Sequence, residues 1–308
     1  MNVKVNTEKN WLLVDGNSLV TYLWFRSGPG KDIASQVWLY LADLLVSYDL
    51  NRIAVAWDHV FVKSKTTGKS TSQCRRRQEY QAYKGNRQGH PDWSKAKPRV
   101  MMEVKNSLKH LPVVQGTLDE LEADDVLWCW TQIVGGLIIS GDEDLWQCCN
   151  NNVRVWSPRK KEDVGIEQIK EKYGSVMAMM IQKALVGDTS DNITGVMGIG
   201  WSRAKRLWEE HSHTLQQLTK TPTSTYTGDD KWLNEVFKQI DVFVRNWKII
   251  KLGEIINEKD MMKAETFLMQ SVKFDSNDAR HYAAYNGWHE IIRKWNAIEK
   301  AFQQALPK

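Results

Sequence analysis

The stretch LIISGDEDLW (Leu137–Trp146) joins a short apolar run to three consecutive acidic residues. The apolar run Leu137–Ile139 (LII), followed by Ser140 and Gly141, is typical of a buried strand leaving the core. Asp142, Glu143 and Asp144 repel one another unless a positive charge lies among them. If side chains keep alternating beyond the strand, Asp142 and Asp144 point the same way, and Glu143 points to solvent or pairs with a neighbouring base.

Two further apolar runs, WLLV (Trp11–Val14) and IAVAW (Ile53–Trp57), also indicate buried strands, and VRVW (Val153–Trp156) is a weaker candidate. In the segments between them, apolar residues recur near helical spacing. Strands that alternate with helices predict a parallel sheet with helices on both faces. The expected helices are 33–50, 98–109, about 118–134, 166–173, 176–185 and 202–211, with a loop at 220–230 and further helices after Lys231.

An acidic residue follows each of the three clearest strands: Asp15, Asp58, and Asp142 with Asp144. Any one of these acids alone is more often a turn residue or a helix cap. In open α/β sheets, however, ligand sites gather beyond the carboxyl ends of the strands. The coincidence across three strands therefore predicts a crevice lined with carboxylates.

The segment around residue 120 carries more acids. Thr117 and Glu120 have capping-box spacing, which predicts a helix start there. Glu122, Asp124 and Asp125 lie in the next turn, where capping does not explain them. We therefore assign these three to the same crevice.

The motif GDTSDN adds Asp188 and Asp191 around a polar turn, although by itself it reads as an Asx-type turn. So many carboxylates in one crevice could not all ionise without cations. Oxygen ligands without His or Cys select Mg²⁺ or Mn²⁺. The number of acids exceeds the need of one ion, so two are expected, an arrangement known for phosphodiester hydrolysis. The predicted ligands are Asp15, Asp58, Glu122, Asp124, Asp125, Asp142, Asp144, Asp188 and Asp191.

The net charge of +5 is concentrated in one basic segment. Between residues 63 and 99, only Glu79 and Asp92 oppose the basic side chains. A solvated loop is the ordinary interpretation of such a run, but Tyr80, Tyr83 and Trp93 lie among the charges and favour a nucleic-acid partner. The basic residues are Lys63, Lys65, Lys69, Arg75, Arg76, Arg77, Lys84, Arg87, Lys95, Lys97 and Arg99.

The remaining composition indicates an ordinary globular chain. The four cysteines show no CxxC spacing and are expected to be free thiols in a reducing compartment. The N-terminus lacks the apolar run of a signal peptide, and no run approaches the length of a membrane span. We therefore expect a cytoplasmic protein.

Six motifs occur in order along residues 11–210: VDGNS, AWD, YKGNR, LEADD, SGDEDLWQ and GDTSDNITGVMGIG. Together they resemble the 5′ nuclease (flap endonuclease) family. The resemblance is closest to its prokaryotic branch, the 5′ nuclease domain of bacterial DNA polymerase I and the bacteriophage 5′–3′ exonucleases. No polymerase segment follows, so we expect the free-standing bacteriophage type.

The resemblance implies an α/β fold: a PIN-like parallel sheet flanked by helices, a helix–three-turn–helix DNA-binding element and C-terminal helices. The expected regions are 1–175, a nuclease core with a basic arch at about 62–99, and 176–308, with the DNA-binding element at about 183–211. It also implies two divalent metals. One would lie nearer Asp15, Asp58, Glu122, Asp124 and Asp142, and the second nearer Asp125, Asp144, Asp188 and Asp191.

Tyr83, Lys84 and Arg87 match the family's basic cluster near the scissile phosphate. There, Lys84 and Arg87 would offset charge that develops on the phosphate oxygens. A solvent-exposed lysine is the alternative for Lys84. Arg75, Arg76 and Arg77 would contact DNA from the arch.

The sequence GVMGIG resembles the family's duplex-binding hairpin, where K⁺ can bind loop carbonyls. The family usually continues Gly-x-Lys-Thr-Ala, whereas here Gly200-Trp201-Ser202-Arg203-Ala204 moves the positive charge by one place. The expected DNA-binding residues are Gly195, Gly198, Gly200, Arg203, Lys205 and Arg206.

The resulting hypothesis is a structure-specific 5′ nuclease, both 5′–3′ exonuclease and flap endonuclease. It would act on DNA and RNA–DNA primers by two-metal catalysis in replication or repair. Its partners would be branched, nicked or 5′-flap DNA and RNA–DNA hybrids, bound by a monomer in a bacterial or phage-infected cell. The alternatives are a PIN-type ribonuclease and a non-catalytic DNA-junction binding protein.

Overall fold

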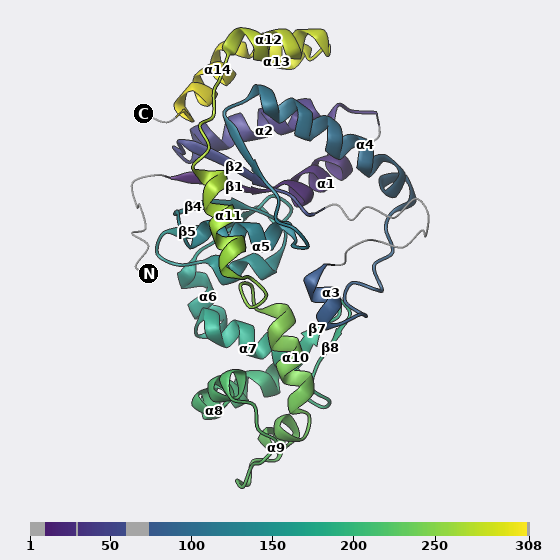
Figure 1. Cartoon of the computed structure of the whole chain (residues 1–308), viewed down its shortest axis with the longest axis vertical. Helices are drawn as coiled ribbons and strands as arrows, with labels where there is room; N and C mark the ends of the chain where they lie inside the picture. Colours follow the sequence, from purple (N-terminus) through teal and green to yellow (C-terminus); the bar gives the residue numbers. More distant parts are fainter. Residues whose placement is uncertain (1–9, 29, 60–73, 307–308) are drawn as a thin grey trace. The chain divides into compact units, whose positions relative to one another are not determined.

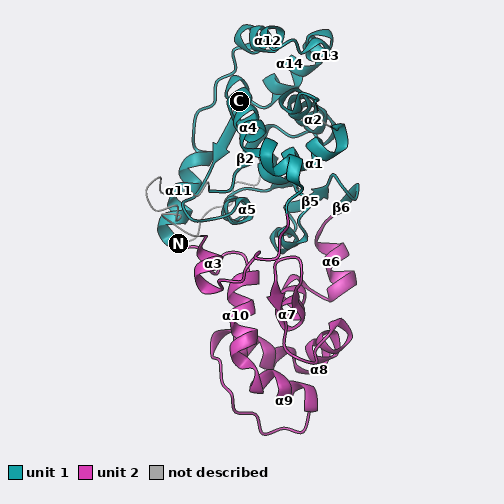
Figure 2. Ribbon diagram, turned by 90° about the vertical axis from the view of Figure 1, so that its right-hand side faces the viewer, with its two compact units in different colours: residues 1–60, 89–163, 257–308 teal, residues 61–88, 164–256 magenta. Residues whose placement is uncertain are grey.

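The computed structural model describes residues 10–28, 30–59 and 74–306, which form two compact units (Figure 2). The first unit takes residues from 1–60, 89–163 and 257–308, and the second from 61–88 and 164–256. The units differ from the regions expected from the sequence in two ways. Residues 257–308 belong to the first unit because their helices pack on its core, and residues 74–88 of the basic segment belong to the second.

A six-stranded sheet of order β3-β2-β1-β4-β5-β6 forms the centre of the first unit (Figure 1). The pairs β1–β2, β1–β4, β2–β3 and β4–β5 are parallel, as predicted. Strands β3 and β6 were not predicted, because β3 has only two apolar residues, Val113 and Val114, and the residues Glu-Asp-Val of β6 show no apolar run. The strands are β1 Trp11–Asp15, β2 Arg52–Ala56, β3 Val113–Gly116, β4 Gly136–Ile139, β5 Val153–Ser157 and β6 Glu162–Val164.

Helices cover both faces of this sheet. Leu12 and Val14 of β1 face a core shared with α1, α2 and α4, whereas α5 packs on β1 and β2 from the other side and α11 packs on β3. Strand β1 is therefore buried on both of its faces, as is usual for a strand in a parallel sheet. The helices of this unit are α1 Gly16–Ser27, α2 Ile33–Ser47, α4 Pro91–Ser107, η1 Leu108–His110, α5 Ala123–Thr131, η2 Glu143–Cys148, α11 Glu258–Leu268, α12 Ser276–Tyr285, α13 His289–Arg293 and α14 Trp295–Gln304.

The second unit is mainly helical. Ile181, Leu185, Leu207 and Phe243 belong to its core, where α7 packs on α8 and α10. Nowhere in the described ranges of either unit does a helix combine the length and apolar character that crossing a membrane requires. The elements are α3 Arg75–Glu79, α6 Ile166–Tyr173, α7 Val176–Val186, β7 Gly187–Asp188, β8 Ile193–Thr194, α8 Trp201–Lys220, α9 Lys231–Lys238 and α10 Ile240–Ile250.

Three helix predictions need correction. Helix α1 was missed because it follows β1 without a turn, with Asp15 itself as the N-cap. Helix α4 begins at Pro91 instead of Pro98, since proline suits the first position of a helix, where no N–H is needed. Helix α8 runs beyond 211 to Lys220, with a non-helical kink at His211.

Candidate functional site

Asp15 is the last residue of β1 and is nearly inaccessible to solvent, with 8% of its surface exposed. Its Oδ1 accepts a hydrogen bond from the Ser18 amide at 2.9 Å, and its Oδ2 accepts one from the Ser140 hydroxyl at 2.8 Å. Ser140 also accepts the amide of Asp142, at 3.1 Å. One serine beyond β4 therefore links the Asp15 carboxylate to the backbone of Asp142, at the ends of two neighbouring strands.

Asp58 lies two residues beyond β2. Its Oδ1 accepts the Ala123 amide at 2.9 Å, and its other oxygen accepts a hydrogen bond from the Asn17 side chain. Because Ala123 is the first residue of α5, the carboxylate joins the end of β2 to the acidic start of that helix. The strands β2, β1 and β4 are adjacent in the sheet, so the predicted gathering of acids at their carboxyl ends is observed within the first unit.

The acids at the start of α5 have different environments. The predicted capping box of Thr117 and Glu120 is wrong: the helix begins at Ala123, with Glu122 as its N-cap. Asp125 is fully buried, and its Oδ2 accepts the Glu122 amide at 3.1 Å. This capping bond is a structural role for Asp125, whereas Glu122 and Asp124 keep part of their surface exposed.

The acidic triplet that follows β4 does not continue as a strand. Asp142 caps the 3₁₀ helix η2, and its Oδ1 accepts the amide of Asp144 at 2.9 Å. The side chains therefore do not alternate as predicted for an extended segment, although the capping bond still places Asp142 and Asp144 together. Glu143 forms an ion pair with Lys160, so the prediction that it pairs with a neighbouring base is confirmed.

The electrostatics of the first unit favour cation binding at this group of acids. The pKa of Asp15 is raised to about 7, mainly by burial and also by the charges of Asp58 and Asp142, although hydrogen bonds from Ser18 and Ser140 lower it. A divalent cation would remove this repulsion and favour the ionised form. The available donors are carboxylate and hydroxyl oxygens, the set that Mg²⁺ and Mn²⁺ prefer, so the residues present fit such an ion.

Asp188 and Asp191 lie in the second unit, around the turn between β7 and β8. Burial raises the pKa of Asp188, but the Lys183 ammonium at 2.8 Å and hydrogen bonds from Ser190 outweigh this effect and hold the pKa at about 2. Asp191 is buried and forms an ion pair with Arg87. Each of these two acids therefore has a basic partner within its own unit.

The predicted cluster Tyr83, Lys84 and Arg87 also lies in the second unit. The Lys84 amide donates to the Asp191 carbonyl at 2.8 Å, with a left-handed backbone at Lys84 (φ 54°). The Lys84 ammonium lies 4.8 Å from the centre of the Tyr83 ring. Tyr83 itself is buried beside Ile193 and Ile249, so its ring supports Lys84 from below the surface.

The arginines of α3 are not equivalent. Arg76 is buried, with 2% exposed, and its Nε donates to the Ile249 carbonyl at 2.9 Å. Its predicted contact with DNA is therefore wrong, because no ligand can reach it. Arg75 donates to the Ile255 carbonyl at 2.9 Å and Arg77 to the Tyr83 carbonyl at 3.0 Å, yet both keep exposed surface. Lys63, Lys65 and Lys69 lie outside the described residues.

The glycine hairpin at Gly195–Gly200 precedes α8. At Gly195 a side chain would collide with the Val186 carbonyl, and Gly198 has a left-handed backbone (φ 83°), so both positions need glycine. Arg203 donates to the Gly198 carbonyl, and its guanidinium lies 3.8 Å from the centre of the Trp232 ring.

Of the other basic residues on α8, Arg206 is engaged by Asp230 at 2.8 Å and by Glu210 at 3.5 Å. Lys205 is exposed, with Glu209 at 4.0 Å. Arg203 and Lys205 therefore remain the better candidates for a phosphate contact.

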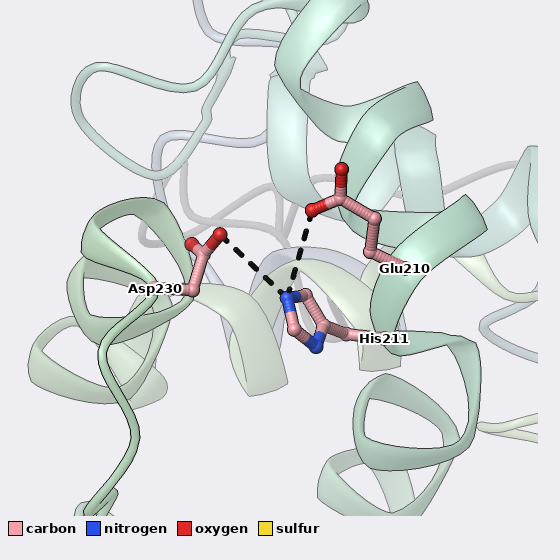
Figure 3. Close-up of side chains that lie close together, drawn as sticks. All are labelled: Glu210, His211 and Asp230. Carbon is pink, nitrogen blue, oxygen red and sulfur yellow. Dashed lines mark ion pairs between the residues drawn. The ribbon is translucent and has the colours of Figure 1, made fainter.

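Glu210, His211 and Asp230 bring three potential ligand atoms within 4.8 Å of one another (Figure 3). The imidazole Nε2 lies 3.6 Å from Asp230 and 3.8 Å from Glu210. However, the Arg206 guanidinium already contacts both carboxylates. A cation would have to displace this charge, so we interpret the group as an ion-pair cluster that holds the start of α9 on α8.

Sequence reasoning missed the residues that position the acids. The Asn17 side chain donates to Asp58, the Ser140 hydroxyl donates to Asp15, and the Ser18 hydroxyl accepts the Gly141 amide beside Asp142. A polar side chain next to an acid gives no signal of its own in the sequence. It also missed Lys105 of α4, whose ammonium lies 4.8 Å from the centre of the Trp57 ring. Burial lowers the pKa of Lys105, against the raising effect of the Asp58 charge.

Several known proteins are similar in sequence to this chain. A DNA polymerase I of Caldicellulosiruptor bescii is 36% identical over 165 residues, 48% of this chain and 19% of that protein. A 5′-3′ exonuclease of Mycoplasma pneumoniae is 28% identical over 221 residues, 66% of this chain and 72% of its relative. The chain thus spans about a fifth of the first of these relatives and most of the second.

Among solved structures, the 5′-exonuclease of bacteriophage T5 with bound zinc shares the fold, with a TM-score of 0.67. The likeness covers 84% of this chain and 98% of the T5 protein, at 21% identity. The family described as 5′-3′ exonuclease, N-terminal resolvase-like domain, matches residues 10–174, which is more than half of the chain. The chain therefore belongs to this 5′-3′ exonuclease family.

Proposed function

We propose that the chain is a divalent-metal-dependent 5′ nuclease that hydrolyses phosphodiester bonds in DNA. The observation that carries this proposal is the group of oxygen ligands at three adjacent strand ends, centred on the buried Asp15 with its raised pKa. Strongly perturbed carboxylates of this kind are typical of functional sites. Membership of the exonuclease family supports the same reaction.

In this proposal, Asp15, Asp58, Glu122, Asp124, Asp142 and Asp144 would hold the metal in the first unit, with Asp125 as a structural support. The ions, when bound, supply an activated nucleophile and neutralise charge on the phosphate. The Asn17 side chain keeps Asp58 in place, and the Ser18 amide and Ser140 hydroxyl hold Asp15. Lys84 and Arg87 would bind the phosphate oxygens and stabilise the charge that develops on them.

We extend the proposal to the finer features that the family resemblance suggests. These are two Mg²⁺ or Mn²⁺ ions, with Asp188 and Asp191 near the second, and K⁺ at the glycine hairpin. The pairs Lys183–Asp188 and Arg87–Asp191 would have to loosen for those acids to bind a metal. The substrates would be 5′-flap, branched or nicked DNA and RNA–DNA hybrids, cut by a cytoplasmic monomer.

Adjacent acids of the η2 segment provide a sharp test. Asp142→Asn removes a charge from the strand end, whereas Glu143→Gln removes one from an ion pair with Lys160. We expect cleavage of a labelled 5′-flap substrate in Mg²⁺ to fall at least about a hundredfold in the Asp142 variant and to change less than about twofold in the Glu143 variant. Cleavage that persists in EDTA, or equal losses in both variants, would contradict the proposal.

The alternatives predict different substrates in the same assay. A PIN-type ribonuclease would cut single-stranded RNA faster than the DNA flap. A binding protein without catalysis would shift the flap in a gel but release no product. The cluster of acidic residues at the strand ends disfavours the non-catalytic binding protein, because acids that face a polyanion weaken binding unless a cation joins them.

A further inference from the structure

Trp201 differs from every other tryptophan of the chain. All fifteen tryptophans are described, and only Trp201 is classed as exposed, with 48% of its surface accessible. It begins α8, directly after Gly200, where a Cβ atom would find no heavy atom within 4 Å. About half of the Trp201 side chain is therefore open to solvent, and the residue does not serve as a core filler.

The surroundings of Trp201 combine aromatic and basic groups. The ring of Tyr173, at the end of α6, lies 6.3 Å away with a tilt of 50°, and the Lys172 ammonium lies 4.9 Å from the centre of that tyrosine ring. Arg203 and Lys205 follow on α8, whose first turn contains no acid. An apolar ring pair bordered by positive charge complements a ligand that carries apolar and anionic groups in alternation.

We propose that Trp201, supported by Tyr173, packs against the deoxyribose of a DNA duplex whose phosphates are held by Arg203 and Lys205. In a nucleic-acid backbone every phosphate is followed by a sugar, so a ring beside phosphate-binding cations meets the sugar's C–H face. This contact rests on the proposed function, and it adds to duplex binding an apolar contribution that does not depend on charge. Trp201 thereby has a role in DNA binding that the glycine hairpin Gly195–Gly200 does not provide.

The dependence of binding on salt separates this contact from the ionic ones. Each lost phosphate contact should reduce the slope of log K against log salt by about 0.9, whereas loss of an apolar contact should leave the slope unchanged. We expect Trp201→Ala to weaken binding of a blunt duplex roughly tenfold at every salt concentration. Lys205→Ala should reduce the slope, and Trp201→Phe should retain most of the affinity.

The measurement is fluorescence anisotropy of a labelled duplex and a labelled single strand, titrated in Ca²⁺ between low and moderate salt. Tyr285→Ala, which removes another exposed aromatic ring, is the matched control and should bind as the wild type. Unchanged duplex affinity in Trp201→Ala, or a changed slope, would overturn the proposal. A larger loss on single strands than on the duplex would also overturn it, because that result indicates stacking on unpaired bases. If the wild type itself fails to bind or cut DNA, the proposed function fails instead.

Discussion

At the scale of single residues, the buried carboxylate of Asp15 is expected to have the largest effect on the stability of the metal-free protein. The residue must end a core strand and cap α1, yet it also has to keep a carboxylate beside Asp58 and Asp142. Burial and like charges make its ionised form unfavourable while no cation is bound. The cost of holding this carboxylate should therefore appear as a pH dependence of the metal-free protein.

We predict that metal-free wild type becomes less stable as the pH rises from 4 to 7. The folded-state pKa of Asp15 is about 7, against 3.8 for the ordinary group, so the folded state binds the extra proton throughout this window. The contribution of Asp15 to stability is largest below the unfolded-state value, falls across the window and levels off above 7. The full effect is at most about 4 kcal/mol.

Asp15→Asn should remove this slope, and its advantage over wild type in EDTA should grow towards pH 8. Urea denaturation of both proteins at several pH values measures it. Mg²⁺ should stabilise the wild type more at pH 8 than at pH 6, since binding must displace the proton. A constant difference between the two proteins from pH 5 to pH 8 would show that Asp15 keeps an ordinary pKa.

At the scale of elements, α9 supports the glycine hairpin through Trp232. Its ring lies under the Arg203 guanidinium and in reach of Gly198, where a Cβ atom would come within 3.2 Å of it. Asp230 caps α9, with hydrogen bonds from Trp232 and Leu233 amides, and also binds Arg206 of α8. The hairpin conformation is therefore coupled to a helix some thirty residues later in the chain.

We predict that Trp232→Ala weakens duplex binding by acting through Arg203. The stacked guanidinium is held in one orientation, and its release costs affinity without removing the charge. Trp232→Ala and Arg203→Ala should each weaken binding, and the double variant should be no weaker than Arg203→Ala alone. A double-mutant cycle of duplex affinities measures this, with Trp232→Phe as the variant that preserves the stack. Additive losses would mean that Trp232 does not act through Arg203.

The elements also show what sequence can predict in a chain of this kind. Apolar runs placed β1, β2, β4 and β5 to within one residue at each end, because buried parallel strands have a strong signal. Strands with few apolar residues, such as β3 and β6, have no such signal, since their pairing depends on neighbouring strands. The acids were identified by their position after strands, but their orientation was not, because η2 and the capping bond of Asp125 replace the extended geometry assumed for them.

At the scale of the molecule, the last helices close the core of the first unit. Residues from α12, α13 and α14 belong to the same hydrophobic cluster as α2. Trp38 of α2 is contacted by Trp288 at 5.1 Å and by Phe302 at 6.3 Å between ring centres. Figure 1 shows α14 beside α2, although most of the chain separates them in sequence.

We predict that Trp288→Ala destabilises the first unit by about 3–5 kcal/mol, the usual cost of removing a large buried aromatic side chain. The change opens a cavity against Trp38 and also removes the bond from the Trp288 indole to Asp32, at 2.6 Å, whose other oxygen caps α2. Urea denaturation followed by circular dichroism measures the loss. Tyr285→Ala, at a 91% exposed position on α12, is the matched control and should cost less than about 0.5 kcal/mol.

Because the C-terminal helices share one core with the sheet that carries Asp15 and Asp58, Mg²⁺ binding should be lost in the same transition as the helices. A Trp288 variant that keeps wild-type stability would mean that these helices are an appendage and not part of the core.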